Sequence, residues 1–466
     1  MPSTPAEWLP ILAKRLDDRY PRIAWLRSYA SNSPPMPEMG ENVRASWVAF
    51  QRKACTGYGG LAVDSLANRI VPNGVRVGDS EENEIVEAAR RIWRDNRLDV
   101  TFADAIKDYL TCSIGYLVDG AAGDSAVISR EIPEQFIAAP DPLKPWKARA
   151  GLKVWRDPDD GMDYAYVWVP GVRQKFARKS QLDNKTLITR ASAGGWVAGQ
   201  VEPYQGDPPI VILERHAGLG LFEPHIPVID RINLGKLQRL VVTAMQAYRQ
   251  RALKVEATKN GQGGLPETDD DGNAIDWAKV FEPAPGALWD LPEGIDIWES
   301  QQTDIRPLLE GEKTDARDFA AVTRTPISVF IPEGENQSAE GAFNAKEGQI
   351  NQAKDEIARI QPGLSVAMVY ALQIEGVDLG GQTVQVTFTR PDHVSLTEMY
   401  AAAAQAKAAG ESWKSIARKI LGYTPDEIRA EEAEQRRNNV SQLLTTIRPT
   451  EPEPAVAEVA AARGEG

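Results

Sequence analysis

The sequence predicts a mixed α+β fold divided into about two to four domains. The chain has 466 residues, its first 112 residues carry helical periodicity, and residues 114–216 consist of short β-rich runs between turn residues. Apolar residues make up 42% and charged residues 26% of the chain, as in folded globular proteins and unlike disordered ones. We therefore expect most of the chain to fold.

The N-terminal part predicts several helices and one strand. Apolar residues recur at helical spacing between Ala6 and Tyr29, and the proline-rich run Ser33–Pro37 ends this pattern. Gly57–Gly60 lies within the next helical block, where a tight bend or close packing is a better interpretation than phosphate binding. The expected elements are helical blocks at residues 44–70, 81–95 and 102–112 and a strand at Ile114–Val118.

The following residues, up to His216, predict an antiparallel meander. Gly, Pro, Asp and Asn turns separate runs at Ala126–Ile132, Gly151–Trp155, Tyr164–Val169, Arg173–Phe176 and Pro209–Leu213. A later segment, Gln382–Arg390, alternates apolar and polar residues. We expect it to be a strand that rejoins this sheet.

Two long helices that frame a small insert are the most distinctive prediction. Ile226–Lys254 predicts a helix of 29 residues, and Thr303–Thr325 predicts a second one. The insert contains the Gly, Asp and Pro-rich segment Asn260–Gly294, with strand candidates at Ala287–Leu291 and Ile295–Trp298. An insert between paired helices must lie beyond their tips, so we expect a stem that carries a small domain at its far end.

The C-terminal third predicts a loop, several helices and a disordered tail. Ile327–Gln337 is an apolar and then polar loop, and Ser338–Glu375 is helical with a break expected at Pro362–Gly363. Leu396–Ala409 closes on Gly410, and Ser412 caps a helix that ends at Gly422. Thr424–Glu427 is a capping box, and residues beyond about 439 are expected to be disordered.

The charge balance and the cysteines exclude several protein classes. The net charge is −13, from 53 basic and 66 acidic residues, which excludes a general basic affinity for DNA or acidic membranes. Cys55 and Cys112 lie far apart, which excludes a disulfide framework and a Cys-type metal site. The N-terminus carries no leader pattern, and the longest uncharged apolar stretch, Gln361–Ile374, is too short to span a bilayer. We expect a cytosolic protein without a membrane contact.

No motif in the sequence predicts catalysis, a cofactor or a metal site. Three scattered histidines do not form a ligand set, and Glu310–Thr314 fails the spacing of a phosphate loop. Glu267–Asn273 resembles a calcium loop but begins with Glu, and its twelfth position is Ala278. An acidic turn at Asp269–Asp271 is the better interpretation, with adventitious calcium as the minor alternative. Carboxylate pairs such as Asp159 and Asp160 predict a solvated turn.

One charge pattern stands out against the acidic chain. Between residues 226 and 254 there is a single acid, Asp230, and six bases: Arg231, Lys236, Arg239, Arg249, Arg251 and Lys254. The second long helix carries five acids against four bases, which suits a partner of the first. The bases either pair with acids on neighbouring subunits or contact phosphate directly, and both interpretations stay open.

The order of elements resembles the portal proteins of tailed double-stranded DNA bacteriophages, in the group similar to siphophage portals. The resemblance covers roughly residues 9–438. It depends on local segments at Leu26–Tyr29, Ala62–Ile70, Ile92–Asp99, Ser113–Val118, Pro227–Asn233, Pro285–Pro292, Thr325–Phe330 and Asn336–Ala342. Ala339 and Gly341 depart from the family, which often has Ser-Gly-Glu-Ala there.

The resemblance implies a portal fold assembled as a ring of twelve subunits at one capsid vertex. Its implied parts are a wing (1–225), stem helices (226–254 and 303–325), a small α/β clip (255–302), a tunnel loop (326–337), a tunnel helix with a wing return strand (338–390), a helical crown (391–439) and a disordered tail (440–466). DNA would pass through the ring during packaging and ejection. The implied location is the virion, with assembly in the host cytoplasm.

The resemblance also implies partners and candidate site residues. The partners would be the terminase large subunit and then a head-completion adaptor at the clip, with the major capsid and scaffolding proteins at the wing. ATP hydrolysis would belong to the terminase, which agrees with the missing phosphate loop. The candidate channel residues are Phe330, Ile331, Glu333, Arg249, Arg251 and Lys254, and the candidate docking residues of the clip are Gly264, Asp269, Asp271 and Trp277. Phe330 and Ile331 would lie near the tip of the tunnel loop, whose apolar start makes burial against a neighbouring subunit an equal alternative.

Physical reasoning agrees with a channel. Twelve copies at −13 carry a charge of −156, so a channel lined mostly by acids would repel DNA and let it slide. The alternatives are a DNA-binding or DNA-processing phage enzyme, disfavoured by the missing catalytic residues, and a non-channel assembly scaffold, disfavoured by the paired helices.

Overall fold

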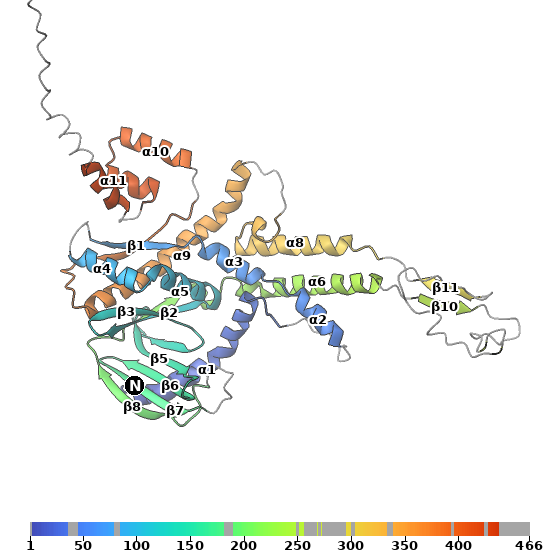
Figure 1. Ribbon diagram of the computed structural model, residues 1–466, viewed down its shortest axis with the longest axis horizontal. Helices are drawn as coiled ribbons and strands as arrows, with labels where there is room; N and C mark the ends of the chain where they lie inside the picture. Colours follow the sequence, from blue (N-terminus) through green and yellow to red (C-terminus); the bar gives the residue numbers. More distant parts are fainter. Residues whose placement is uncertain are drawn as a thin grey trace, which may run out of the picture.

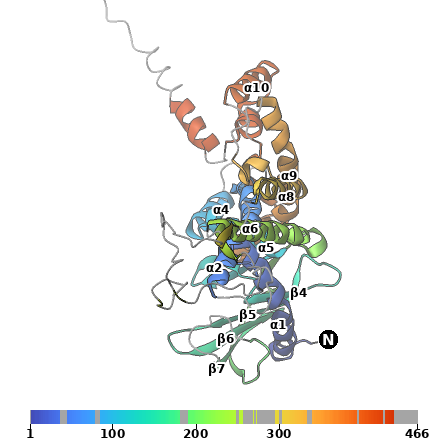
Figure 2. The ribbon, with the colours of Figure 1, turned by 90° about the vertical axis from the view of Figure 1, so that its right-hand side faces the viewer.

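The computed structural model describes residues 2–35, 45–78, 84–180, 190–247, 251–255, 268, 272, 295–299, 303–332, 339–392, 396–423 and 427–437. Figure 1 shows a body of helices and sheets from which two helices, α6 and α8, project side by side as an arm. Figure 2, turned by 90°, shows the C-terminal helix α10 and the strands of the largest sheet on opposite sides of the arm. The mixed α+β class predicted from the sequence is confirmed.

Helices α1 (Pro5–Ala30), α2 (Ala45–Ala54), α3 (Tyr58–Ala67), α4 (Glu84–Asp95) and α5 (Leu98–Cys112) form the N-terminal part. A capping box between Thr4 and Glu7 begins α1. The predicted block at 44–70 is two helices, separated at Cys55–Gly57. A Cβ atom on Gly60 would lie 2.3 Å from the carbonyl oxygen of Ala30, so this glycine lets α3 pack directly against the end of α1. The close-packing interpretation of the glycines is confirmed.

The predicted meander is two sheets. Strands β4 (Phe136–Pro140), β5 (Ala148–Arg156), β6 (Met162–Val169), β7 (Val172–Lys179) and β8 (Val197–Pro203) form a five-stranded antiparallel sheet in chain order. Strands β2 (Ile114–Ala122), β3 (Ser125–Glu131) and β9 (Ile210–Glu214) form a separate sheet in the order β3-β2-β9.

The strand predicted at residues 382–390 pairs with a partner that the sequence did not suggest. Strand β12 (Val384–Phe388) is antiparallel to β1 (Pro72–Val77) and does not join the meander, which corrects the prediction. Pro72 and Gly74 lower the strand propensity of β1, and the register shifts between these two residues. Burial of Val384 and Val386 in the main core holds β12 in place.

Two main cores hold the body together. The larger core joins α3, α4, α5 and α9 (Ala339–Ile374) and contains fully buried residues such as Phe102, Tyr109 and Met368. The second core packs the first half of α1, with Trp8 and Leu12, against the five-stranded sheet. The buried carboxylate of Asp108 accepts hydrogen bonds from Arg27 and Arg130, the latter at 2.6 Å, and this paired arrangement offsets the cost of burying a charge.

The first long helix is shorter than predicted. Helix α6 (Ile226–Ala247) does not reach Lys254, and Arg251–Val255 forms strand β10, which pairs antiparallel with β11 (Ile295–Glu299). Pairing with a strand distant in sequence overrides the local helical pattern there. The predicted strand at 295–298 is confirmed, the candidate at 287–291 lies outside the described residues, and the second long helix is α8 (Arg306–Thr323).

Helix α9 continues through Pro362, so the predicted break is wrong. Proline removes one backbone donor from a helix, but contacts around it keep the chain helical. The Ser365 hydroxyl donates to the Gln361 carbonyl at 2.7 Å and accepts from the Val386 amide at 3.0 Å. A Cβ atom on Gly363 would lie 2.6 Å from Leu213, so the helix presses directly against β9.

The C-terminal helices form a small separate layer above β1 in Figure 1. They include α10 (Leu396–Ala408), α11 (Trp413–Ile416), a π-helical turn, η4 (Ala417–Leu421), and a helical segment at residues 427–437. Ser412 accepts a hydrogen bond from the Ser415 amide at 3.3 Å, which confirms the predicted cap. Most of the capping box at 424–427 and the tail beyond 439 lie outside the described residues.

Cys55 and Cys112 are both free thiols, and burial raises the pKa of Cys112 to about 12. Among the described residues, no helix is long and apolar enough to cross a bilayer. The same residues contain no group of three or more His, Cys, Asp and Glu side chains arranged to hold a metal ion.

Candidate functional site

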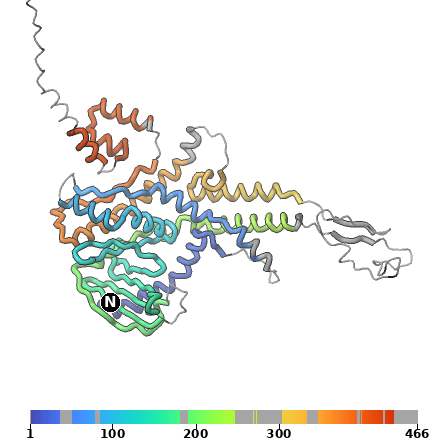
Figure 3. Tube along the Cα trace, viewed as in Figure 1, coloured from blue at the N-terminus to red at the C-terminus, as the bar shows by residue number. Residues whose placement is uncertain are grey.

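The arm formed by α6 and α8 is the candidate functional site. The two helices lie side by side along their length, as the tube in Figure 3 shows. The arm carries the β10–β11 pair at its far end (Figure 1). The pairing of α6 with α8 agrees with the two neighbouring helices that the sequence predicts, and most of the insert between them lies outside the described residues.

Bases of α6 pair with acids of α8 in the same chain. Arg231 contacts Asp315 at 2.8 Å and Asp318 at 3.3 Å, and Arg239 contacts Glu312 at 2.8 Å. The two sites differ in exposure: the side chain of Arg231 is 53% exposed, whereas those of Arg239 and Glu312 are 28% and 12% exposed. The second pair is screened less by solvent and contributes more to holding the helices together.

Polar contacts tie the root of the arm to the body. The buried side chain of Asn233 accepts hydrogen bonds from the Thr56 amide at 3.0 Å and from its hydroxyl at 2.9 Å. The Tyr29 hydroxyl donates to Asp230 at 2.6 Å, and burial together with this carboxylate raises the pKa of Tyr29. Both contacts join α6 to segments far away in sequence, so the arm leaves the body at a defined angle.

Lys236 lies in an unusual setting between the arm and the body. Its ammonium group is 5.0 Å from the centre of the Tyr58 ring, a cation–π contact. Burial lowers the pKa of Lys236, and the nearby Glu312 carboxylate opposes this shift. Of the six bases singled out in the sequence, Arg231, Lys236 and Arg239 therefore have partners within their own chain.

Within a single chain, the candidate channel residue Phe330 is buried. A place in the channel and burial against a neighbouring subunit were equal alternatives for its loop; the ring is only 8% exposed and lies in the main core of its own chain. Its centre is 5.0 Å from that of Tyr58 and 5.4 Å from that of Phe319 on α8. Burial of a large aromatic ring is favourable and stabilises Phe330 in this cluster.

Two other residues of this loop, Ile331 and Glu333, are also candidate channel residues. The chain after α8 makes a short turn, η3 (Ile327–Val329), and Ile331 packs at the edge of the core. Glu333, the third candidate channel residue of the loop, lies outside the described residues.

The hairpin at the end of the arm contains two of the predicted basic residues. In the β10–β11 register, Arg251 is the partner of Glu299 and Lys254 is the partner of Asp296, so each basic residue is paired along the backbone with an acidic one. Both residues lie in strand β10 and not in the long helix that the sequence predicts up to Lys254. Arg249, Gly264, Asp269, Asp271 and Trp277 lie outside the described residues.

A basic cavity between the C-terminal helices and the body was not anticipated from the sequence. Its lining includes Arg76, Arg390 and Arg418, which come from three distant segments. No local motif connects these positions, so only the fold reveals the cluster.

Comparison with known proteins identifies a family. Residues 11–441 match the family model described as phage portal protein, SPP1 Gp6-like. No curated protein sequence matches the chain.

The chain is also similar to solved neck and virion structures of gene transfer agent (GTA) particles. The neck of a native GTA particle, computed with C12 symmetry, has 14% identity and a TM-score of 0.46, covering 85% of this chain and 98% of that one. The neck of an empty GTA particle, computed with C6 symmetry, has 16% identity and a TM-score of 0.47, covering 87% and 99%. The virion of a native particle has 16% identity and a TM-score of 0.41, covering 87% and 99%.

Proposed function

The chain belongs to the SPP1 Gp6-like family of phage portal proteins, and on this premise we propose how its parts act as a head-to-tail connector. Copies of the chain form a ring, with twelve subunits as the expected number, at one vertex of the capsid. Double-stranded DNA passes through the central channel during packaging and ejection. The protein acts as a structural conduit without catalysis of its own.

The observation that carries this proposal is the braced arm. A pair of helices that is held together by ion pairs and anchored in the body behaves as a stiff strut. Such struts, repeated around a closed ring, form the wall of a channel. The arm also exposes the apolar side chains of Leu234, Leu309 and Val322, which are 42%, 37% and 46% exposed and available for contact with neighbouring copies.

We assign the parts of the portal fold to the observed elements. The wing comprises the body with its three sheets, the stem comprises α6 and α8, and the crown comprises α10, α11 and η4. The clip begins after α6 and includes the β10–β11 pair, since this pair lies at the far end of the stem.

The clip is the proposed docking site for the terminase large subunit and later for a head-completion adaptor. The wing is the proposed contact for the major capsid and scaffolding proteins. ATP hydrolysis during packaging belongs to the terminase.

A substitution that adds bulk and charge in the clip, Gly264→Arg, should leave ring assembly intact and block docking or packaging, because the clip has little core of its own. Normal virion yield from this variant would contradict the clip assignment.

The channel residues are a narrower set than the sequence predicts. Since Phe330 is buried, the proposed lumen contacts are Ile331, Glu333, Arg249, Arg251 and Lys254.

Charge reversal at Arg251 distinguishes a contact between subunits from a contact with DNA. If rings weaken and a compensating reversal on α8 of a neighbour restores them, the contact is between subunits. If rings persist while DNA retention changes with salt, the contact is with DNA backbone. Unchanged rings and unchanged packaging at every salt concentration would refute both roles.

The test of the ring itself is its mass and shape. Twelve copies of a 51.1 kDa chain have a mass of about 613 kDa, which mass photometry of the purified full chain measures directly. Negative-stain images should show rings with an axial hole. A Leu309→Asp variant should shift the distribution to monomers, whereas Arg15→Gln, a change at an exposed position of α1, should not. A monomer without rings for the wild-type chain at all concentrations would favour an enzyme or a non-channel scaffold.

A further inference from the structure

A cavity of about 350 Å³ lies where the crown meets the body. Its floor is the β1–β12 pair with part of α4 and α9, and its roof is formed by α11, η4 and the residues that follow them. Among the lining residues there is no Asp or Glu, and there are six basic side chains: Arg76, Arg90, Arg390, Lys414, Arg418 and Arg429. In a chain with a net charge of −13, such a concentration of positive charge is unexpected.

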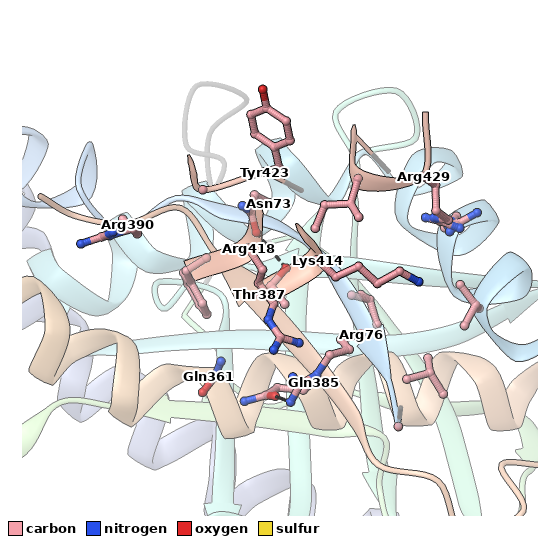
Figure 4. Close-up of a pocket in the computed structure, with 18 residues that line it drawn as sticks. Asn73, Arg76, Gln361, Gln385, Thr387, Arg390, Lys414, Arg418, Tyr423 and Arg429 are labelled. Carbon is pink, nitrogen blue, oxygen red and sulfur yellow. Dashed lines mark hydrogen bonds between the residues drawn. The ribbon is translucent and has the colours of Figure 1, made fainter. Parts of the chain in front are cut away.

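Figure 4 shows how these side chains are arranged. Arg418 extends from the crown toward Arg76 and Gln385 on the two strands, while Arg390 and Arg429 lie on opposite sides of the cavity. Neutral hydrogen-bonding side chains complete the lining: Asn73, Gln361, Gln385, Thr387 and Tyr423. The Gln385 carbonyl oxygen accepts from Arg76 at 2.7 Å, so the amide nitrogen of this glutamine is left to donate elsewhere.

Carboxylates outside the lining pair with Arg390 and Lys414. Arg390 pairs with Asp392 at 2.8 Å, and Lys414 pairs with Glu432 at 3.3 Å. Neither acid belongs to the lining. Arg76 is bonded to a neutral amide, and Arg418 is an exposed guanidinium in the centre of the group. Cations gathered around one space repel each other, so an anion inside the cavity would be stabilised.

We propose that this cavity binds a phosphate group, supplied either by the backbone of a nucleic acid or by free phosphate. Guanidinium groups match the tetrahedral oxyanion with paired hydrogen bonds, and amide and hydroxyl donors fill its remaining acceptor positions. Arg76 and Arg418 are exposed, which makes the site accessible to a phosphate on a long polymer as well as to a free ion. The cavity lies apart from the arm formed by α6 and α8.

A bound phosphate would also link the crown to the body. Arg418 and Lys414 belong to the crown, whereas Arg76 and Arg390 flank the β1–β12 pair. An anion between the two groups replaces repulsion by attraction. Occupancy of the cavity should therefore stabilise the position of the crown on the wing.

The test uses the full chain with sodium phosphate and with a short DNA duplex as probes. Isothermal titration calorimetry against sodium phosphate, at ionic strength matched with chloride, should show binding to the wild-type chain. The double variant Arg76→Gln and Arg418→Gln should bind phosphate about tenfold or more weakly, because it lacks two charge-assisted hydrogen-bond donors to the anion. Arg15→Gln, a change at an exposed position on α1, should bind like the wild type. Circular dichroism checks that the variants fold.

The duplex distinguishes the two sources of phosphate. If the ligand is a nucleic-acid backbone, the duplex binds to the wild-type chain. In that case the logarithm of its association constant depends less steeply on the logarithm of the salt concentration in the double variant. The slope becomes smaller by about 0.9 for each DNA phosphate that the variant no longer neutralises. If the ligand is free phosphate, sodium phosphate binds and the duplex shows no dependence on Arg76 and Arg418. Equal affinity of the wild type and the double variant for both probes would overturn the proposal.

Discussion

Replacing Phe330 by alanine separates a packing role from a channel role. The ring packs against both Tyr58 on α3 and Phe319 on α8, with centre-to-centre distances of 5.0 and 5.4 Å. Removing the Phe330 ring leaves a void at the place where three parts of the molecule meet: the root of the arm, the loop that follows α8, and the body. If Phe330 instead acted on DNA in the lumen, its removal would leave local stability unchanged.

The expected loss of stability follows from burial. Phe330 is 8% exposed, and truncation of a buried Phe to Ala costs about 3–5 kcal/mol, including the cavity that remains. The neighbouring turn, η3, is short and able to collapse partly into the void, so we expect the lower end, about 3 kcal/mol. This corresponds to a change on the order of 100-fold in a local opening equilibrium.

Hydrogen exchange measured by mass spectrometry on the full chain tests this magnitude. Amides of α8 and α3 should lose protection by on the order of 100-fold in Phe330→Ala, while amides of the five-stranded sheet should not change. Arg317→Gln, at an exposed position of α8, is the matched control and should change protection by less than about threefold. Equal protection of α8 in the two variants, together with a selective defect in DNA passage, would refute the packing role.

Three further variants test other contacts. Arg239→Glu should lower the free energy of unfolding measured in urea by about 2 kcal/mol, because two carboxylates then meet at a partly buried site. Adding Glu312→Arg should restore most of the lost free energy of unfolding. If the second change restores none of it, the two side chains do not pair directly. Among the described residues neither carboxylate oxygen of Asp119 has a hydrogen-bond partner, and burial raises its pKa well above 3.8. The native state therefore holds a proton that the unfolded state releases above about pH 4, so this residue's contribution to stability falls as pH rises toward the native pKa. Asp119→Asn should remove that fall and raise the free energy of unfolding at pH 7 relative to the wild type. Coinciding profiles of stability against pH for the two proteins would contradict the assignment. Gly60→Ala should lower the free energy of unfolding by about 1–3 kcal/mol, because the new Cβ atom would lie 2.3 Å from the Ala30 carbonyl oxygen. This loss should appear as a lower melting temperature. An unchanged melting temperature would disprove the tight contact.

Elements specified by local patterns were predictable. Helix α1 follows from apolar residues at helical spacing, and the cap at Ser412 follows from one side chain and the backbone beside it. The paired-helix arm was predictable for the same reason, because its two helical segments and the turn-rich insert between them are each continuous in sequence. The family followed from such segments, and the match over residues 11–441 confirms it.

The tertiary structure decided what depends on partners distant in sequence. The end of α6 at Ala247 depends on the pairing of β10 with β11, and the place of β12 depends on β1, more than 300 positions away in the chain. Strand pairing is a non-local hydrogen-bonding choice that an alternating pattern cannot specify.

The same limit applies to the sites. Apolar character alone did not show whether Phe330 faces a lumen or a core, because both environments depend on what the fold places around the ring. The basic cavity joins Arg76, Arg390 and Arg418, and their charges act on one another only because the fold brings them around one space. Electrostatic interaction depends on distance in space and not on separation along the chain, so the sequence determined which charges exist and the tertiary structure determined which of them interact.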